Sequence, residues 1–264
     1  MAPTPAGSGT TSQATSPDHV ESLRVVLRAA EAASAAATLE EAAAVVLADL
    51  CRLAGWPVGH LYVANGPSSL APTSTWHLDD PERFRVLRQV AQAMGVVAGP
   101  GGGLPGRVLA SGRPETGDDV GEAAAQAGLS AAVGVPVVCR GEVVALLHLL
   151  GDTSAAAGLL LDAASAAADQ LGRVVDRRRA AAAEDGRRRL VETANDAYVR
   201  LDPAGTILEW NPQAESMFGW LRDEVVGRRL SEIVIPVRYR PAHEEGFRRA
   251  MAAPEGPHSS KREF

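Results

Sequence analysis

Three short turns each join two strand-type segments that are neighbours in the sequence. The turns contain Asn65-Gly66, Arg140-Gly141 and residues 202–205. Strands joined by so few residues pair in antiparallel fashion, because a parallel pair needs a crossover of a dozen or more residues. The chain is therefore predicted to fold as an α+β protein with antiparallel sheets. The expected strand pairs are 57–64 with 70–78, 131–139 with 142–150, and 197–201 with 206–210.

Helix-type sequence surrounds these hairpins. Residues 20–53 contain no glycine or proline and are rich in alanine, leucine and glutamate, a composition that favours helix. Thr38 followed by Glu41 has the form of a capping box, which divides this stretch into two helices. Further helices are expected at 80–94, with Asp80 as N-cap, and at 104–111.

A long helix is predicted from Asp152 onward. Five apolar residues recur in it at alternating spacings of three and four, which is the pattern of a helix that pairs with another helix. We expect this 161–175 seam to hold a homodimer together. The seam consists of Leu161, Ala164, Ala168, Leu171 and Val175.

Charge and composition exclude several classes of partner. A chain of 264 residues is long enough for two modest domains, and its net charge of −6 is unfavourable for wrapping nucleic acid. Two arginine triplets, 177–179 and 187–189, are interleaved with acidic residues and are expected to form a solvated linker face. The sequence has no secretory signal and no long apolar run, so we expect a cytoplasmic protein without a membrane span.

The glycine run at 101–106 has the spacing G-x-G-x-x-G. A dinucleotide site with this spacing needs a preceding buried parallel strand and backbone N–H groups around the phosphates. Only Val96 and Val97 precede the run, and Pro105 lacks an N–H group. We therefore expect a connector whose glycines permit close packing and unusual backbone angles. A flexible lid over a small ligand remains an alternative.

The residues from about 20 to 176 resemble a GAF domain. Four segments carry the resemblance, in this order: WPVGHLYVAN, WHLDDPERF, GGLPGRVLASGRPE and AAVGVPVVCRGEVVALLHLL. These segments are similar to GAF domains of bacterial sensor kinases. The resemblance implies an antiparallel sheet flanked by helices around a small-molecule pocket. The signatures for covalent bilin and for cyclic nucleotides are absent, which disfavours both ligands. GAF enzymes that reduce free methionine sulfoxide depend on several cysteines around the pocket, and Cys51 and Cys139 do not supply that set.

The residues from about 190 to 251 resemble the first part of a PAS domain. The motif LVETANDAYVRLDPAGTILEWNPQAESMFGW carries the resemblance, and the later strands of a PAS sheet are missing. The predicted organisation is therefore a GAF-like domain, a long connecting helix and a partial PAS-like α+β domain. The expected ranges are a disordered tail at 1–18, the GAF domain at 19–176, the connecting helix at 177–189 and the partial PAS domain at 190–264.

Candidate site residues follow from these resemblances. Tyr62, Trp76, Phe84 and Leu104 are candidates for the GAF pocket, because aromatic and apolar side chains dominate ligand cavities; ordinary core packing is the alternative. His243 stands where a PAS haem ligand falls, but the strands that complete a haem pocket are missing, so we expect it to cap or pair locally. The GRRL motif at 227–230 lacks the cysteine of flavin photochemistry.

The remaining reactive residues suggest no chemistry. His60, His77 and His148 are scattered over expected strands and are interpreted as core or edge residues rather than as metal ligands. Cys51 and Cys139 are interpreted as small core residues. No catalytic residue is assigned, and we expect no enzymatic activity from these residues.

The sequence therefore predicts a signal-input module. It would sense a small-molecule or redox cue in its GAF and PAS pockets and pass the signal through a dimeric linker helix to an output domain outside this chain. Two alternatives remain open. The chain is either the sensory part of a histidine kinase or nucleotide cyclase, or a ligand-free dimerisation scaffold.

Overall fold

A computed structural model of the chain describes residues 17–252 and divides into two compact units, 1–179 and 180–264. The division falls within the long helix α6 (Ala157–Glu192). Residues 1–16 of the expected tail lie outside the described residues, and Pro17 and Asp18 are the first residues of α1 (Pro17–Ala35).

The first unit is built on one six-stranded antiparallel sheet, as the hairpins predicted. Its strand order is β3-β2-β1-β6-β5-β4, and every neighbouring pair is antiparallel. The two central strands, β1 and β6, pair although they are far apart in the sequence. The strands are β1 (Val58–Ala64), β2 (Ser69–Leu78), β3 (Val96–Val97), β4 (Glu115–Gly117), β5 (Ala131–Cys139) and β6 (Glu142–Gly151).

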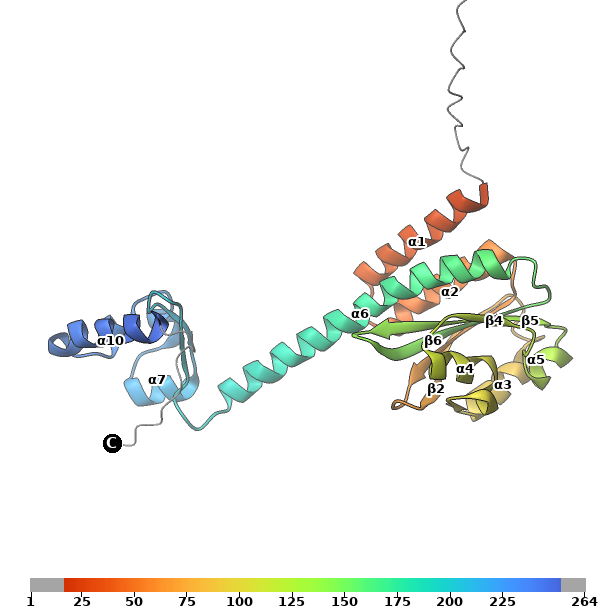
Figure 1. The fold of residues 1–264 in the computed structure, drawn as a ribbon. Coiled ribbons are helices and arrows are strands. Elements are labelled where there is room, and N and C mark those ends of the chain that lie inside the picture. Colours follow the sequence, from red (N-terminus) through yellow and green to blue (C-terminus); the bar gives the residue numbers. More distant parts are fainter. Residues whose placement is uncertain (1–16, 253–264) are drawn as a thin grey trace, which may run out of the picture. The chain divides into compact units, whose positions relative to one another are not determined.

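Helices cover both faces of this sheet (Figure 1). α1, α2 (Leu39–Ala54) and the first part of α6 lie on one face, and the shorter helices lie on the other. Alternate residues of a strand point to opposite faces, so Leu147 and Leu149 pack toward the long helices while Leu146 and Leu150 pack on the other side. The shorter helices are α3 (Arg85–Ala93), the 3-10 turn η1 (Pro100–Gly102), α4 (Gly103–Ser111) and α5 (Glu122–Gln126).

The helix starts follow local capping chemistry. Thr38 Oγ1 accepts a hydrogen bond from the Glu41 N–H at 3.0 Å, and the Glu41 carboxylate accepts one from the Thr38 N–H at 3.2 Å, so the predicted capping box is confirmed. The predicted start at Asp80 is wrong. The Asp80 carboxylate accepts from the N–H groups of Glu82 and Arg83, but the chain makes only a turn there, and α3 begins at Arg85.

The expected dimer seam on α6 faces the protein's own core. Ala164, Ala168 and Leu171 are at most 2% exposed, and Leu161 and Val175 pack against the same core cluster. The assignment of these five residues to a homodimer interface is therefore wrong. Their spacing reflects an amphipathic helix that covers its own sheet, a pattern that sequence alone cannot distinguish from a coiled-coil seam.

The second unit is smaller. Its two-stranded antiparallel sheet pairs β7 (Val199–Leu201) with β8 (Ile207–Trp210), and its core contains Ile207, Trp210, Ala214 and Val225. The helical elements are α7 (Pro212–Phe218), α8 (Arg222–Val225), α9 (Leu230–Ile233), the 3-10 turn η2 (Val237–Tyr239) and α10 (Arg240–Ala252). None of the helices within residues 17–252 combines the length and the apolar character that a membrane-spanning segment requires.

Candidate functional site

A cavity of about 410 Å³ lies in the first unit, on the face of the sheet opposite the long helices. β1 contributes His60 and Tyr62, β2 contributes Trp76, and β6 contributes His148 and Leu150. The rest of the wall comes from α3 with the following residues 94–97, from the glycine loop with the start of α4, and from 119–124.

Three of the four predicted pocket residues line this one cavity. Tyr62, Trp76 and Leu104 are part of its wall. Phe84 is not; it is fully buried in the core cluster on the same side of the sheet, with the Arg83 guanidinium 4.7 Å from its ring centroid. The structure thus brings three candidates together and places Phe84 in the core.

The register of the sheet assembles a cluster of aromatic rings in the cavity wall. His60 is paired with Trp76 across β1 and β2, and with His148 across β1 and β6. Such cross-strand neighbours are close enough for their side chains to interact. The His60 and Trp76 rings are stacked, with centroids 3.6 Å apart and planes at 11°, and the Tyr62 ring meets His60 edge-on at 4.3 Å.

Several polar atoms of this cluster are buried without a hydrogen-bond partner. His60 Nε2 lies 3.1 Å from the Thr73 carbonyl oxygen, but His60 Nδ1, Trp76 Nε1 and His148 Nε2 have no partner within the described part of the chain. Buried polar groups are nearly always hydrogen-bonded, because an unmet one costs about 1–3 kcal/mol. Three residues that line one cavity therefore each leave one buried polar atom without a partner.

Burial fixes the charge of these groups. It lowers the pKa of His60 to about 3, against a smaller opposing effect of its hydrogen bond to Thr73, and it lowers the pKa of His148 to about 4. Burial likewise raises the pKa of Tyr62 to about 12. All three side chains are therefore uncharged at neutral pH.

The glycine run forms part of the cavity wall through tight backbone packing. A Cβ atom on Gly102 would lie 2.1 Å from the Val97 carbonyl oxygen, and one on Gly106 would lie 2.5 Å from the same oxygen. Gly99 and Gly103 have φ of 101° and 61°, which favour glycine. The prediction that these glycines serve close packing and unusual angles is confirmed.

Sequence reasoning missed the two cavity histidines. It treated His60, His77 and His148 alike, whereas the structure places His60 and His148 in the cavity wall and leaves His77 out of it. One signal was available, since His60 and Tyr62 are two residues apart on a strand and must point to the same face. Within the described residues, no group of three potential ligands could hold a metal ion.

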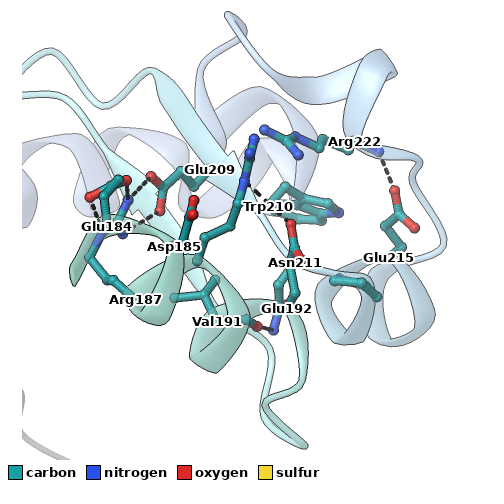
Figure 2. Close-up of a pocket in the computed structure, with 12 residues that line it drawn as sticks. Glu184, Asp185, Arg187, Val191, Glu192, Glu209, Trp210, Asn211, Glu215 and Arg222 are labelled. Carbon is teal, nitrogen blue, oxygen red and sulfur yellow. Dashed lines mark hydrogen bonds and ion pairs between the residues drawn. The ribbon is translucent and has the colours of Figure 1, made fainter. Parts of the chain in front are cut away.

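The second unit has a cavity of about 420 Å³ between the end of α6 and the start of α7 (Figure 2). Arg187 of α6 lies between two carboxylates there, with Nη2 2.8 Å from Glu184 Oε1 and 3.0 Å from Glu209 Oε1 on β8. Arg200 also binds Glu209, at 2.8 Å. Hydrogen bonds from Arg187 and Arg200 lower the pKa of Glu209 to about 2, so this carboxylate is ionised at neutral pH.

Asn211 ties the same region together. Its Oδ1 accepts hydrogen bonds from the N–H groups of Tyr198 (2.8 Å) and Ala214 (2.9 Å), which caps α7 as Asn-Pro predicted. Its Nδ2 donates to the carbonyl oxygens of Val191 and Asp196, both at 3.0 Å. One amide side chain thus joins the end of α6, the segment between α6 and β7, and α7.

His243 lies on α10 in the wall of a further cavity, of about 320 Å³. Its ring centroid is 6.4 Å from that of Phe247. Charged side chains, among them Arg229, Glu244 and Arg248, share that wall. The role of His243 stays a prediction.

Comparison with known proteins relates the C-terminal part of the chain to one family. Residues 186–264 match the family model of the PAS fold. An uncharacterized protein of Azorhizobium caulinodans is 42% identical over 72 residues, which are 27% of this chain and 10% of that protein. The match therefore spans a tenth of the length of this relative.

Solved structures resemble the N-terminal part. The GAF domain from a phosphoenolpyruvate-protein phosphotransferase of Coxiella burnetii has a TM-score of 0.50 at 18% identity, covering 64% of this chain and 99% of that one. A free methionine-R-sulfoxide reductase from Neisseria meningitidis, solved in complex with its substrate, has a TM-score of 0.49 at 14% identity, covering 64% and 96%. At 18% identity, the likeness to the Coxiella burnetii GAF domain concerns the fold alone.

Proposed function

Because the chain joins a GAF fold to a region that matches the PAS family, as its sequence motifs predicted, we propose that it is a signal-input module. GAF and PAS domains are sensory domains typical of signal-transduction proteins. In this proposal the cavity of the first unit binds a small molecule, and α6 carries the resulting change into the PAS part. The proposed parts are a GAF domain at 19–176, a connecting helix at 177–189 and a partial PAS domain at 190–264, in the cytoplasm.

The observation that carries the proposal is the set of unpartnered buried polar atoms in the cavity wall. His60, Trp76 and His148 each leave one such atom, whereas a cavity that serves only packing is lined by apolar groups. A ligand that meets these atoms would remove their cost and gain the apolar contacts of the remaining wall.

The packing of α6 supports the relay. β6 carries the cavity residues His148 and Leu150 on one face and the core residues Leu147 and Leu149 under α6 on the other. α6 approaches β5 closely, since a Cβ on Gly172 would lie 2.4 Å from the Val138 carbonyl oxygen. Beyond that point Asp176 binds Arg140 of the β5–β6 turn at 2.7 Å. A shift of β5 or β6 would therefore also displace α6.

Retention of a ligand tests the sensing role. Native mass spectrometry of the purified protein is expected to show a non-covalent small molecule, and a cavity-filling Ala91→Trp variant is expected to lose it. Ala93→Trp is the matched control, because Ala93 lies on the same helix but is exposed and outside the cavity. If wild type retains nothing and a fragment library produces no stabilisation, the sensing role is contradicted.

A dimerisation scaffold is a second candidate, favoured by one observation. Val20, Leu23 and Leu27 of α1 are 42%, 56% and 57% exposed and lie at spacings of three and four, so they form an apolar stripe on one helix face. We propose that this stripe, rather than the 161–175 seam, pairs with a second copy. Light scattering is expected to give a dimer that Leu23→Glu dissociates, whereas Leu190→Glu, at a 74% exposed leucine of α6, leaves it intact.

The output of the module is a separate proposal. The chain would be the sensory part of a longer protein, such as a histidine kinase or a nucleotide cyclase, and would have no catalytic activity of its own. An assay of the purified chain for ATP or GTP turnover is expected to give no signal above buffer.

A further inference from the structure

We propose that the cavity of the first unit selects an uncharged, ring-bearing molecule with an N–H or O–H donor, and rejects carboxylates and phosphates of the same shape. The inference rests on the proposed ligand-binding function and specifies its ligand class. It follows from the charges, the hydrogen-bonding atoms and the rings of the cavity wall.

The charges of the wall exclude anions. Among the described residues that line the cavity, none is a lysine or an arginine, while Asp119 and Glu122 are carboxylates. Arg107 reaches Asp119 at 3.3 Å but is also bound to Glu115 at 3.2 Å, so two carboxylates already neutralise it. An anion placed here would lose its hydration without meeting a free positive charge, which is strongly unfavourable.

The two histidines cannot supply that charge. Burial keeps both neutral, with the pKa of His60 lowered to about 3 and that of His148 to about 4. An imidazole in this state offers one donor and one acceptor rather than a cation.

The unpartnered His60 Nδ1 requires a hydrogen-bond donor on the ligand. His60 Nε2 faces the Thr73 carbonyl oxygen, which can only accept, so the proton is on Nε2 and Nδ1 carries a lone pair. Trp76 Nε1 is a donor without a partner. A ligand group that both donates and accepts, such as an amide, would satisfy the two atoms together. Both are buried in this structure, so the ligand reaches them by parting the stacked His60 and Trp76 rings.

The rest of the wall fits a flat apolar body. Leu87, Met94 and Leu150 lie around the aromatic cluster, and the rings of Tyr62 and Trp76 offer faces and edges for stacking. A volume of about 410 Å³ is in the range of small-molecule sites. The wall therefore matches a planar ring with one polar edge.

Two probes of one shape test the selection. Benzamide and benzoate share a phenyl ring and a planar three-atom head, and they differ in charge. Each is titrated into the ¹⁵N-labelled full chain, and the indole N–H signal of Trp76 is followed, assigned with a Trp76→Phe variant. Benzamide is expected to shift this signal at millimolar concentration, and benzoate is expected to bind at least about tenfold more weakly.

A matched pair of variants tests the acceptor. His60→Phe keeps a ring against Trp76 but removes Nδ1, so it is expected to weaken benzamide binding about fivefold to tenfold. His77→Phe changes a histidine of the same sheet that does not line the cavity and is expected to leave the affinity unchanged.

The outcomes separate this inference from the function on which it rests. If benzoate binds as tightly as benzamide, the selection is overturned while ligand binding stands. Unchanged benzamide affinity in His60→Phe overturns the assigned acceptor. If no probe shifts the Trp76 signal and wild type retains no molecule in native mass spectrometry, the ligand-binding function itself falls.

Discussion

At the scale of single residues, His60 destabilises the fold in two ways: its polar ring is buried, and one ring nitrogen has no hydrogen-bond partner. It is 1% exposed, it stacks on Trp76, and one of its ring nitrogens has no partner. A phenylalanine would fill the same space without the desolvation cost and without the unpartnered Nδ1, although it would remove the donor to the Thr73 carbonyl oxygen. The histidine is therefore unfavourable for stability alone, which is common for residues that serve a site.

The depressed pKa of His60 makes the stability of the first unit depend on pH. The folded pKa of about 3 lies below the ordinary value of 6.5, so the unfolded chain binds the extra proton first as pH falls. Stability from this residue is complete above pH 6.5 and is lost toward pH 3, at roughly 1.4 kcal/mol per pH unit. Urea denaturation at pH 7.5 and 5.5 should show wild type losing about 1 kcal/mol more than His60→Phe. Equal losses would contradict this.

Two glycines of the run at 101–106, Gly101 in the 3-10 turn and Gly106 in α4, should respond differently to an added methyl group. Gly106→Ala places a Cβ 2.5 Å from the Val97 carbonyl oxygen and 2.6 Å from that of Gly99, so backbone must move. We expect a loss of roughly 1–3 kcal/mol, which exceeds the gain in helix propensity of about 1 kcal/mol. Gly101→Ala meets nothing within 4 Å and should change stability by less than about 0.5 kcal/mol. Chemical denaturation of both variants compares them, and equal stabilities would show that the loop adapts.

At the scale of elements, the sequence predicts where helices and turns begin and end, but it does not predict which side of a helix faces the protein's own core. The capping box at Thr38 and the turn at Arg140-Gly141 depend on residues within four positions, so the sequence located α2 and the β5–β6 hairpin correctly. The side to which the α6 seam faces depends on a sheet formed far away in the sequence. The periodicity was real, but it could not distinguish this chain's own core from a second copy.

The contact of α6 with β5 can be tested with two glycines of one helix. Gly172→Ala would bring a Cβ within 2.4 Å of the Val138 carbonyl oxygen, whereas Gly158 has open space around it. We expect Gly172→Ala to destabilise the first unit by roughly 1–3 kcal/mol and Gly158→Ala to be neutral or slightly stabilising. Far-UV circular dichroism during urea titration measures both. A neutral Gly172→Ala would mean that α6 moves away from the strand without cost.

The end of α6 is held by ion pairs that hydrogen exchange can detect. Glu209→Gln removes the negative charge shared by Arg187 and Arg200, so amides at 187–192 should exchange faster than in wild type. Glu192→Gln is the control, because Glu192 pairs only with Arg188 of the same helix in the described structure. Unchanged exchange in Glu209→Gln would show that Asn211 and apolar contacts alone hold the helix end.

At the scale of the whole molecule, the order of the sequence motifs predicted the domain organisation better than any single motif did. The GAF fold, the helix and the PAS region were expected in this sequence order, and three of four pocket candidates share one cavity. The prediction for Phe84 was wrong because an aromatic side chain is as common in a packed core as in a cavity wall. His60 and His148 were missed because only the pairing of β1 with β2 and β6 brings them to Trp76.

A relay through α6 requires energetic coupling, and coupling is reciprocal. If a ligand in the first unit shifts an equilibrium of the PAS part, then a substitution that shifts the same equilibrium must alter ligand affinity. Glu209→Gln, far from the cavity in sequence and outside its wall, should therefore change benzamide affinity by about threefold or more, whereas Glu192→Gln should not. Titration of the Trp76 signal in both variants measures this. Identical affinities in all three proteins would leave the cavity a ligand site and remove the relay, because two sites without coupling free energy cannot signal to each other.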